Sequence, residues 1–236
     1  MYQKVKNKGR NTPYHYSVKS WEKWCDKNNH LLFVLDQRIH EEDFMNANWH
    51  KIYALELLDA NEIDYDQVLI ADADTIIHPN APNIFSLTDN KFCAVHGFGS
   101  YDWICRSIEN YKKYVFPNVD VDLFDYFNSG IIVCNRTHKD FYSKVISFYN
   151  QNHELLRDMQ EKFSVGTDQP VLNFMVQSEN VDYKQLGYEW NMQDLKRFEL
   201  LDEELTFTKV GWIYHFNGID DNIRNYIMEK TARTIL

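Results

Sequence analysis

Short apolar runs alternate along the chain with segments in which apolar residues recur every three or four positions. Residues 31–36 (LLFVLD) and 66–72 (DQVLIAD) are runs of the kind that fills a buried parallel strand. Helical spacing precedes each run, over residues 14–27 and 49–60, and predicts an amphipathic helix in both places. The first part of the chain therefore predicts a βαβ arrangement.

The alternation continues toward the C-terminus. Strands are predicted at residues 91–97 and 129–135, and each is followed by an amphipathic segment that predicts a helix, beginning near Tyr101 and near Lys139. Residues 211–216 (GWIYHF) predict a late strand. Because no internal repeat or Pro/Gly-rich linker interrupts the pattern, we expect one α/β domain over all 236 residues. Its central sheet is expected to be mostly parallel and flanked by helices.

One predicted helix, over residues 167–176 (TDQPVLNFMV), has a well-marked start. Thr167 and Asp168 are both good N-cap residues, and Pro170 suits the first helical turn. Asp168 therefore has a purely structural interpretation as a helix cap, beside any chemical role.

Composition and charge exclude several classes of protein. The net charge of −10 argues against a nucleic-acid partner, because phosphate backbones are bound by clustered Lys and Arg. No run approaches the roughly 20 apolar residues of a transmembrane helix, and the N-terminus lacks the apolar core of a signal peptide. The four cysteines contain no C-x-x-C pair. These features predict a soluble, cytoplasmic chain with reduced thiols.

Two aspartates follow the second apolar run, in the segment LIADADTIIHPN at residues 69–80. Side chains alternate along a strand, so Asp72 and Asp74 are expected to face the same way, with Ala73 pointing inward. Two like charges about 4 Å apart repel by roughly 4 kcal/mol at an effective dielectric constant near 20. The pair therefore predicts a cation, or a metal-complexed anion, between the carboxylates.

Four short segments together resemble the GT-A fold glycosyltransferases, and in particular glycosyltransferase family 8. They are DADT at residues 72–75, FNSGIIV at 127–133, GTDQPVLN at 166–173 and HFNG at 215–218. A single D-x-D is common by chance, whereas four motifs in this order are specific. The resemblance implies a Rossmann-like GT-A domain that transfers a hexose, with retention of configuration, from a nucleotide sugar to a hydroxyl acceptor such as a glycan.

The resemblance also implies a metal and a donor pocket. Asp72, Asp74 and His215 would bind Mn²⁺ or Mg²⁺, and an imidazole among carboxylates shifts the preference toward Mn²⁺. The donor is expected to be a UDP-sugar. Residues expected to contact it are Asp72, Ala73, Lys51, Asn128, Ser129, Gly130, Gly218 and Arg224.

The same resemblance assigns the catalytic pair. Asp168 would bond hydroxyls of the donor sugar, and Gln169 would face the anomeric carbon opposite the leaving group. An amide is a poor nucleophile, so a front-face transfer is the expected mechanism. His215 has a competing interpretation as an ordinary structural histidine, and Lys51 as a surface charge.

Two departures from the family pattern affect the donor pocket. Family members commonly follow the His-Phe-x-Gly motif with a lysine and an aromatic residue that grip the diphosphate, whereas this chain continues IDDNIRNY. Arg224 or Lys51 is the candidate substitute. The family also opens with an apolar strand, whereas this chain opens with the polar stretch MYQKVKNKGRN, which predicts a missing or atypical first strand.

Two other functions compete with this hypothesis. A GT-A-like protein with a degraded pocket would bind a sugar nucleotide without catalysis. A haloacid-dehalogenase-type phosphatase also places D-x-D after a strand, but its motif requires Thr or Val where this chain has Ile76, and it leaves the FNSG and GTDQ segments unexplained.

Overall fold

The computed structural model describes residues 14–195 and 204–236. The chain forms two compact units. Of the described residues, the first contains residues 14–38, 71–87, 187–195 and 204–236, and the second contains residues 39–70 and 88–186. The expected atypical first strand falls within residues 1–13, outside the described residues.

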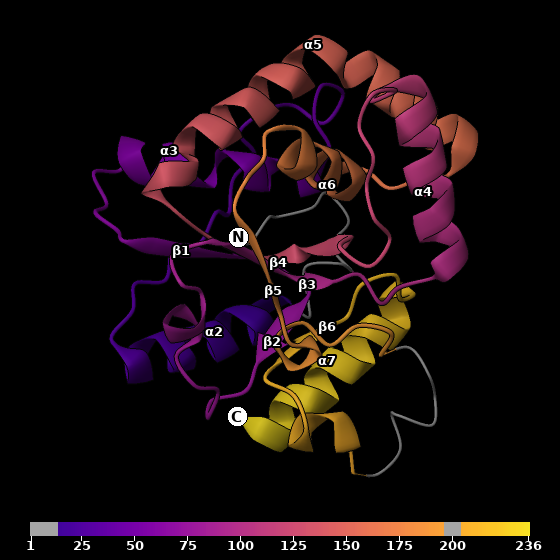
Figure 1. Ribbon diagram of the computed structural model, residues 1–236. Coiled ribbons are helices and arrows are strands. Elements are labelled where there is room, and N and C mark those ends of the chain that lie inside the picture. The colour runs from indigo at the N-terminus through magenta and orange to yellow at the C-terminus, as the bar shows by residue number, and fades with distance from the viewer. Residues whose placement is uncertain (1–13, 196–203) are drawn as a thin grey trace. The chain divides into compact units, whose positions relative to one another are not determined.

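A four-stranded sheet organises the second unit, in the order β1-β4-β3-β5 (Figure 1). Its strands are β1 (Gln67–Ala71), β4 (Phe127–Asn135), β3 (Phe92–His96) and β5 (Tyr183–Leu186). β3 pairs antiparallel with β4 and parallel with β5. Every residue of β4 is buried, as expected for a central strand.

Helices cover this sheet. They are α3 (Ala54–Ala60), α4 (Tyr101–Tyr114), α5 (Lys139–Phe163) and α6 (Asp168–Ser178), and the 3₁₀ helices η1 (Ala47–Tyr53) and η3 (Arg136–His138) precede α3 and α5. Figure 1 shows α4, α5 and α6 on one side of the strands. Helix α6 packs on β4, which places the start of that helix beside the central strand.

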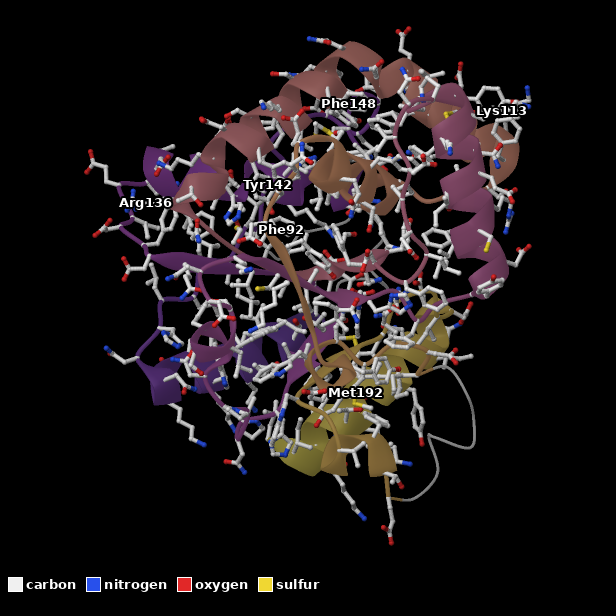
Figure 2. The ribbon with its side chains drawn as sticks, in the orientation of Figure 1. Phe92, Lys113, Arg136, Tyr142, Phe148 and Met192 are labelled. Atoms are coloured by element: carbon white, nitrogen blue, oxygen red, sulfur yellow. The ribbon has the colours of Figure 1, made fainter. Side chains whose placement is uncertain are left out.

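Large apolar side chains between the strands and helices form the core of the second unit. In Figure 2, Phe92 and Tyr142 point into this interior, whereas Lys113 and Arg136 lie at its periphery. Phe92 is 0% exposed and Tyr142 is 2% exposed. Burying one such side chain contributes about 1.5–3 kcal/mol, so the packing of strands against helices dominates the stability of this unit.

The first unit is built on a two-stranded antiparallel ladder of β2 (Thr75–Ile77) and β6 (Ile213–His215), in which Thr75 is opposite His215. Helices α2 (Tyr14–Asn28) and α7 (Asp221–Ile235) pack against each other, and α2 also packs on β2. Short 3₁₀ helices complete the unit: η2 (Ile84–Leu87), η4 (Tyr188–Trp190) and η6 (Thr206–Lys209).

The predicted α/β class, a central sheet flanked by helices, is confirmed. The helices expected near residues 14, 101, 139 and 167 are present, as are the strands expected near residues 91, 129 and 211. The single-domain organisation stays a prediction. No helix in the described part of the chain combines the length and the apolar character needed to cross a membrane.

The strand expected at residues 31–36 is a wrong prediction, because this segment is irregular. Leu31 is 70% exposed and Val34 is 36% exposed. A strand persists only when a neighbouring strand satisfies its backbone groups, and an apolar run by itself supplies no such neighbour.

Candidate functional site

The two aspartates of the D-x-D segment lie in the turn between β1 and β2, beyond the end of the strand in which alternation placed them. The Oγ1 atom of Thr75 donates a hydrogen bond to the carbonyl of Asp72 (2.7 Å). The amide of Phe216 donates to the carbonyl of Asp74 (2.9 Å). These two bonds fix the turn beside the end of β6.

His215, the last residue of β6, brings its imidazole to this turn. Its Nε2 atom lies 3.3 Å from Oδ1 of Asp74 and 3.9 Å from Oδ2 of Asp72. One ligand atom from each of the three residues lies within 4.8 Å of the other two. The structure therefore brings together the three side chains that the sequence predicted as metal ligands, and this donor set of two carboxylates and one imidazole fits Mn²⁺.

The charge of Asp74 is strongly stabilised. Burial by itself raises the pKa of this carboxyl group, but the neighbouring imidazole of His215 and the Arg224 guanidinium outweigh burial and lower the pKa to about 2. Asp74 is therefore an anion at neutral pH and can act as a ligand without first losing a proton.

Arg224, on α7, holds the loop that follows His215. Its Nε atom donates to the carbonyl of Phe216 (3.0 Å), and its Nη2 atom donates to the carbonyl of Ile219 (2.8 Å). Its Nη1 atom bonds Asp221 (2.8 Å). The loop also contains Gly218 at φ +62°, a conformation that favours glycine. The role of Arg224 and Gly218 in donor binding stays a prediction.

A second group of predicted residues lies in the second unit, around a buried ion pair. The Nζ atom of Lys51 is 3.2 Å from Oδ2 of Asp168 and donates to the carbonyl of Ser129 (3.0 Å). Lys51 is 3% exposed and Asp168 is 4% exposed. The interpretation of Lys51 as a surface charge is therefore wrong, because the side chain is buried against a carboxylate.

Asp168 accepts hydrogen bonds at both of its oxygens. Oδ2 accepts from the hydroxyl of Ser129 (2.7 Å), while Oδ1 accepts from Asn48 (3.1 Å) and from the hydroxyl of Thr167 (2.9 Å). Burial raises the pKa of Asp168, but Lys51 and these hydroxyl groups lower it by a larger amount. The N-cap position of α6 belongs to Thr167, which makes no capping bond, so Asp168 is not the helix cap.

Gln169 is directed at the same part of β4. Its Oε1 atom accepts hydrogen bonds from the side chain of Asn128 (3.0 Å) and from the amide of Ser129 (3.3 Å). All three residues are less than 9% exposed. The structure thus joins Asn128, Ser129, Asp168 and Gln169 in one buried polar network.

An irregularity in β4 explains the position of these residues. Ala94 pairs with Ile132, but the next residue, Val95, pairs with Asn128, so β4 contains three extra residues at positions 129–131. Bulges of this kind bend a strand and redirect its side chains, and they are common next to active sites. Here the bulge contains both Ser129 and Gly130.

The sequence did not predict three residues that contact the candidate site residues. Asn48 and Thr167 bond Asp168, and the Oδ1 atom of Asn191 lies 3.0 Å from Nδ1 of His215. Asn48 precedes Lys51 by one helical turn, a spacing that could have indicated a shared face. No local pattern marks Asn191, because its partner lies in a different segment of the chain.

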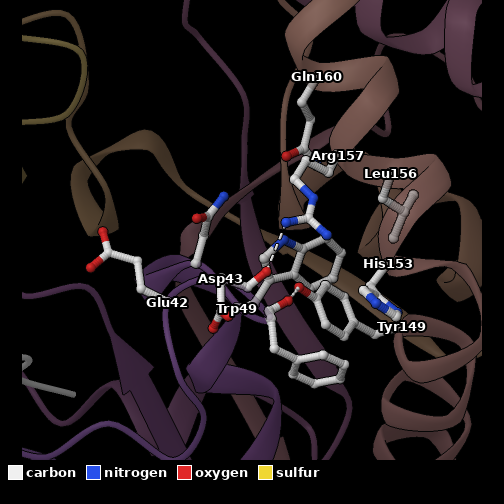
Figure 3. Close-up of a pocket in the computed structure, with 10 residues that line it drawn as sticks. Glu42, Asp43, Trp49, Tyr149, His153, Leu156, Arg157 and Gln160 are labelled. Atoms are coloured by element: carbon white, nitrogen blue, oxygen red, sulfur yellow. Dashed lines mark hydrogen bonds between the residues drawn. The ribbon is translucent and has the colours of Figure 1, made fainter.

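A pocket in the second unit is separate from these residues (Figure 3). In it, the guanidinium of Arg157 donates to the carbonyl of Asp43 (2.7 Å), shown as a dashed line. The rings of Trp49 and Tyr149 are almost completely buried. None of the predicted site residues is among the described residues that line it: Glu42, Asp43, Phe44, Asn46, Trp49, Tyr149, His153, Leu156, Arg157 and Gln160.

Comparison with solved structures identifies the fold. A glycosyltransferase involved in the glycosylation of the major capsid of PBCV-1 superposes with a TM-score of 0.57 at 12% identity, covering 97% of this chain and 96% of that protein. The galactosyltransferase LgtC, solved in complex with donor and acceptor sugar analogs, superposes with a TM-score of 0.54 at 15% identity, covering 99% of this chain and 94% of LgtC. No protein-family model matches the sequence, and neither does any curated protein.

The chain therefore has the GT-A fold of these glycosyltransferases. At this level of identity the likeness concerns the fold, so the activity has to be argued from the residues themselves.

Proposed function

We propose that this chain is a glycosyltransferase that binds a divalent cation, Mn²⁺ or Mg²⁺, and moves a hexose from a nucleotide sugar to a hydroxyl acceptor such as a glycan. The expected donor is a UDP-sugar. The observation that supports the proposal most strongly is the convergence of Asp72, Asp74 and His215 in a chain with the fold of glycosyltransferases.

The acidic turn after β1 and His215 are proposed to hold the diphosphate end of the donor. A divalent cation bound there would supply Lewis-acid stabilisation of the negative charge that develops on the departing nucleoside diphosphate. Asp72, Asp74 and His215 provide two carboxylates and one imidazole for it. Ala73, within the same turn, and Gly218, in the loop after β6, are the proposed backbone contacts of the donor.

The bulge of β4 and the start of α6 are proposed to hold the donor sugar. Asn128, Ser129 and Gly130 are its proposed contacts, on the bulge of β4. Asp168 already accepts hydrogen bonds from four groups, about the full capacity of a carboxylate. A sugar hydroxyl that bonds Asp168 therefore has to replace one of those protein donors. Ser129, whose hydroxyl can rotate, is the easiest to redirect.

Gln169 is proposed to lie at the reacting carbon. Its neutral amide can stabilise positive charge on an oxocarbenium-like transition state, but it is a poor nucleophile. We therefore propose a front-face transfer with retention, in which the leaving phosphate accepts the proton of the acceptor hydroxyl. Lys51 keeps Asp168 ionised beside this residue.

Thermal denaturation tests the metal site. Mn²⁺ together with UDP should raise the melting temperature by more than the sum of their separate effects, because each ligand strengthens the binding of the other. Asp74→Asn should abolish this synergy. Asp26→Asn, the same change at an exposed position of α2, is the matched control and should retain it. An undiminished shift in Asp74→Asn would refute the assignment of Asp74.

Hydrolysis of UDP-sugars separates a catalyst from a protein that only binds the donor. The parent protein should release UDP slowly from at least one UDP-sugar in the presence of Mn²⁺. Gln169→Ala should lower this rate at least about a hundredfold, the scale expected for one preorganised contact, while the Mn²⁺–UDP thermal shift persists. Binding without any hydrolysis or transfer, over a panel of nucleotide sugars, would favour the non-catalytic alternative.

A further inference from the structure

The amide side chain of Asn191 lies next to the imidazole of His215, with 3.0 Å between Oδ1 of Asn191 and Nδ1 of His215. Asn191 is 0% exposed and His215 is 2% exposed, so water does not compete freely for this contact. We infer that Asn191 is a positioning residue that fixes the tautomer and the ring orientation of His215 for a divalent cation. This inference rests on the metal site of the proposed function.

The backbone holds Asn191 at a fixed place beside β6. The amide of Met192, the next residue, donates to the carbonyl of Ile213 (2.8 Å), and the amide of His215 donates to the carbonyl of Met192 (2.8 Å). Met192 also forms a parallel β-bridge with Tyr214, the residue between Ile213 and His215 in β6. The segment that contains Asn191 is therefore paired with the strand that contains His215, which sets the distance between the two side chains.

The direction of the hydrogen bond selects one tautomer. The Nε2 atom of His215 faces Asp74 and Asp72, so it is this nitrogen whose lone pair has to be available to a cation. The proton of a neutral imidazole is then on Nδ1 and requires an acceptor. The carbonyl-type oxygen of the Asn191 amide supplies that acceptor, since Oδ1 has no proton of its own to donate.

Two substitutions at Asn191 separate this role from simple packing. Asn191→Leu keeps the approximate volume and removes the acceptor, whereas Asn191→Asp keeps an acceptor oxygen. Loss of such a supporting contact lowers metal affinity 10–100-fold in other metal sites. We expect the Kd for Mn²⁺, measured from the electron paramagnetic resonance signal of free Mn²⁺, to rise about 10–100-fold in Asn191→Leu and to stay within about threefold of the parent in Asn191→Asp.

A matched control comes from α2 in the same unit. The side chain of Asn28 bonds only a carbonyl of its own helix among the contacts that the structure gives it, that of Trp24 (2.8 Å). Asn28→Leu should therefore leave the Mn²⁺ Kd unchanged. Pulsed resonance spectra should show the nitrogen coupling of a directly bound imidazole in the parent and in Asn191→Asp, and a weakened coupling in Asn191→Leu.

The parent protein provides a test that needs no variant. When Co²⁺ replaces Mn²⁺, a bound imidazole with a proton on Nδ1 gives a strongly shifted proton resonance that is present in H₂O and absent in D₂O. We expect one such resonance. Its absence from the Co²⁺ protein, or an unchanged Mn²⁺ affinity in Asn191→Leu, would overturn the inference while leaving the metal site in place. A parent protein that binds neither metal would refute the proposed metal site and this inference with it.

Discussion

At the scale of single residues, the most unusual feature is a charged pair inside the second unit. Lys51 and Asp168 are almost completely buried, and charged side chains are rarely buried unless they are paired. Removing two charges from water costs several kcal/mol, so such a pair is weak evidence of stabilisation. Here Lys51 contacts both Asp168 and the carbonyl of Ser129, so the pair holds the Asp168 carboxylate beside Ser129.

A double-mutant cycle tests this pair. Lys51→Met and Asp168→Asn should each lower the free energy of unfolding by about 3 kcal/mol, because each leaves a buried charge without its partner. The double variant should lose less than the sum of the two, with a coupling energy of about 1–3 kcal/mol. Urea unfolding with unchanged m-values is the appropriate measurement.

The control for this cycle is an exposed pair in the same unit. Lys91 and Asp182 are 2.9 Å apart, but their side chains are 38% and 72% exposed. The same cycle on that pair should give a coupling energy close to zero, because water and salt screen it. Additive effects at Lys51 and Asp168 would show that their contact contributes nothing to the folded state.

At the scale of elements, the turn before α6 positions Asp168 and Gln169. The amide of Gly166 bonds the hydroxyl of Ser107 (3.0 Å), and the carbonyl of Gly166 accepts from Tyr111 (2.7 Å). Both partners are on α4. The start of α6 is therefore fixed by a neighbouring helix, which compensates for the absence of a side-chain cap at its N-terminus.

Gly166→Ala should disturb this turn. The added Cβ atom would lie 2.8 Å from the ring of Pro170 and 2.8 Å from the ring of Trp103, closer than carbon atoms approach without displacement. We expect the free energy of unfolding to fall by about 1–3 kcal/mol. Gly99→Ala is the control, because a Cβ atom there meets nothing within 4 Å. Equal melting temperatures for the two variants would contradict the crowding at Gly166.

At the scale of the whole molecule, the chain carries a net charge of −10, and two of its carboxyl groups are ionised in partly or fully buried positions. Asp74 lies among His215 and Arg224, and Asp168 lies beside Lys51. In both cases the interactions with these neighbouring side chains outweigh the effect of burial and lower the pKa. The folded state therefore holds these protons less tightly than the unfolded chain.

This difference determines how stability depends on pH. The folded-state pKa of Asp168 is below its unfolded value of about 3.9. The ionised carboxylate therefore contributes fully to the free energy of unfolding well above pH 4, and this contribution is lost as the pH falls through the folded-state pKa. The urea midpoint should therefore drop between pH 6 and pH 3. In Asp168→Asn the urea midpoint should be lower at pH 6 and should fall less between pH 6 and pH 3. In Asp26→Asn the midpoint should fall by the same amount as in the parent. An identical drop in Asp168→Asn would contradict the lowered pKa.

Local features of the sequence determined the fold class, and the motif resemblance supplied the residues of the candidate site, whose roles stay predictions. Helical spacing located α2, α4 and α5, and the order of the D-x-D, N-S-G, D-Q and H-F-N-G segments predicted which side chains contact the donor and the metal. The helix predictions succeed because the periodicity of apolar residues acts over a few neighbouring positions. The grouping of Asp72, Asp74 and His215, by contrast, came from the motif resemblance.

Tertiary structure decided which groups these side chains contact. The partner of Lys51 is Asp168, the partner of Nδ1 of His215 is Asn191, and the bulge in β4 depends on its pairing with β3. The apolar run at residues 31–36 is irregular because a strand also requires a neighbouring strand that satisfies its backbone groups. Contacts of this kind join segments that are far apart in the chain, and strand pairing and packing determine them. A pattern of neighbouring residues contains no information about the distant surface against which a side chain will pack.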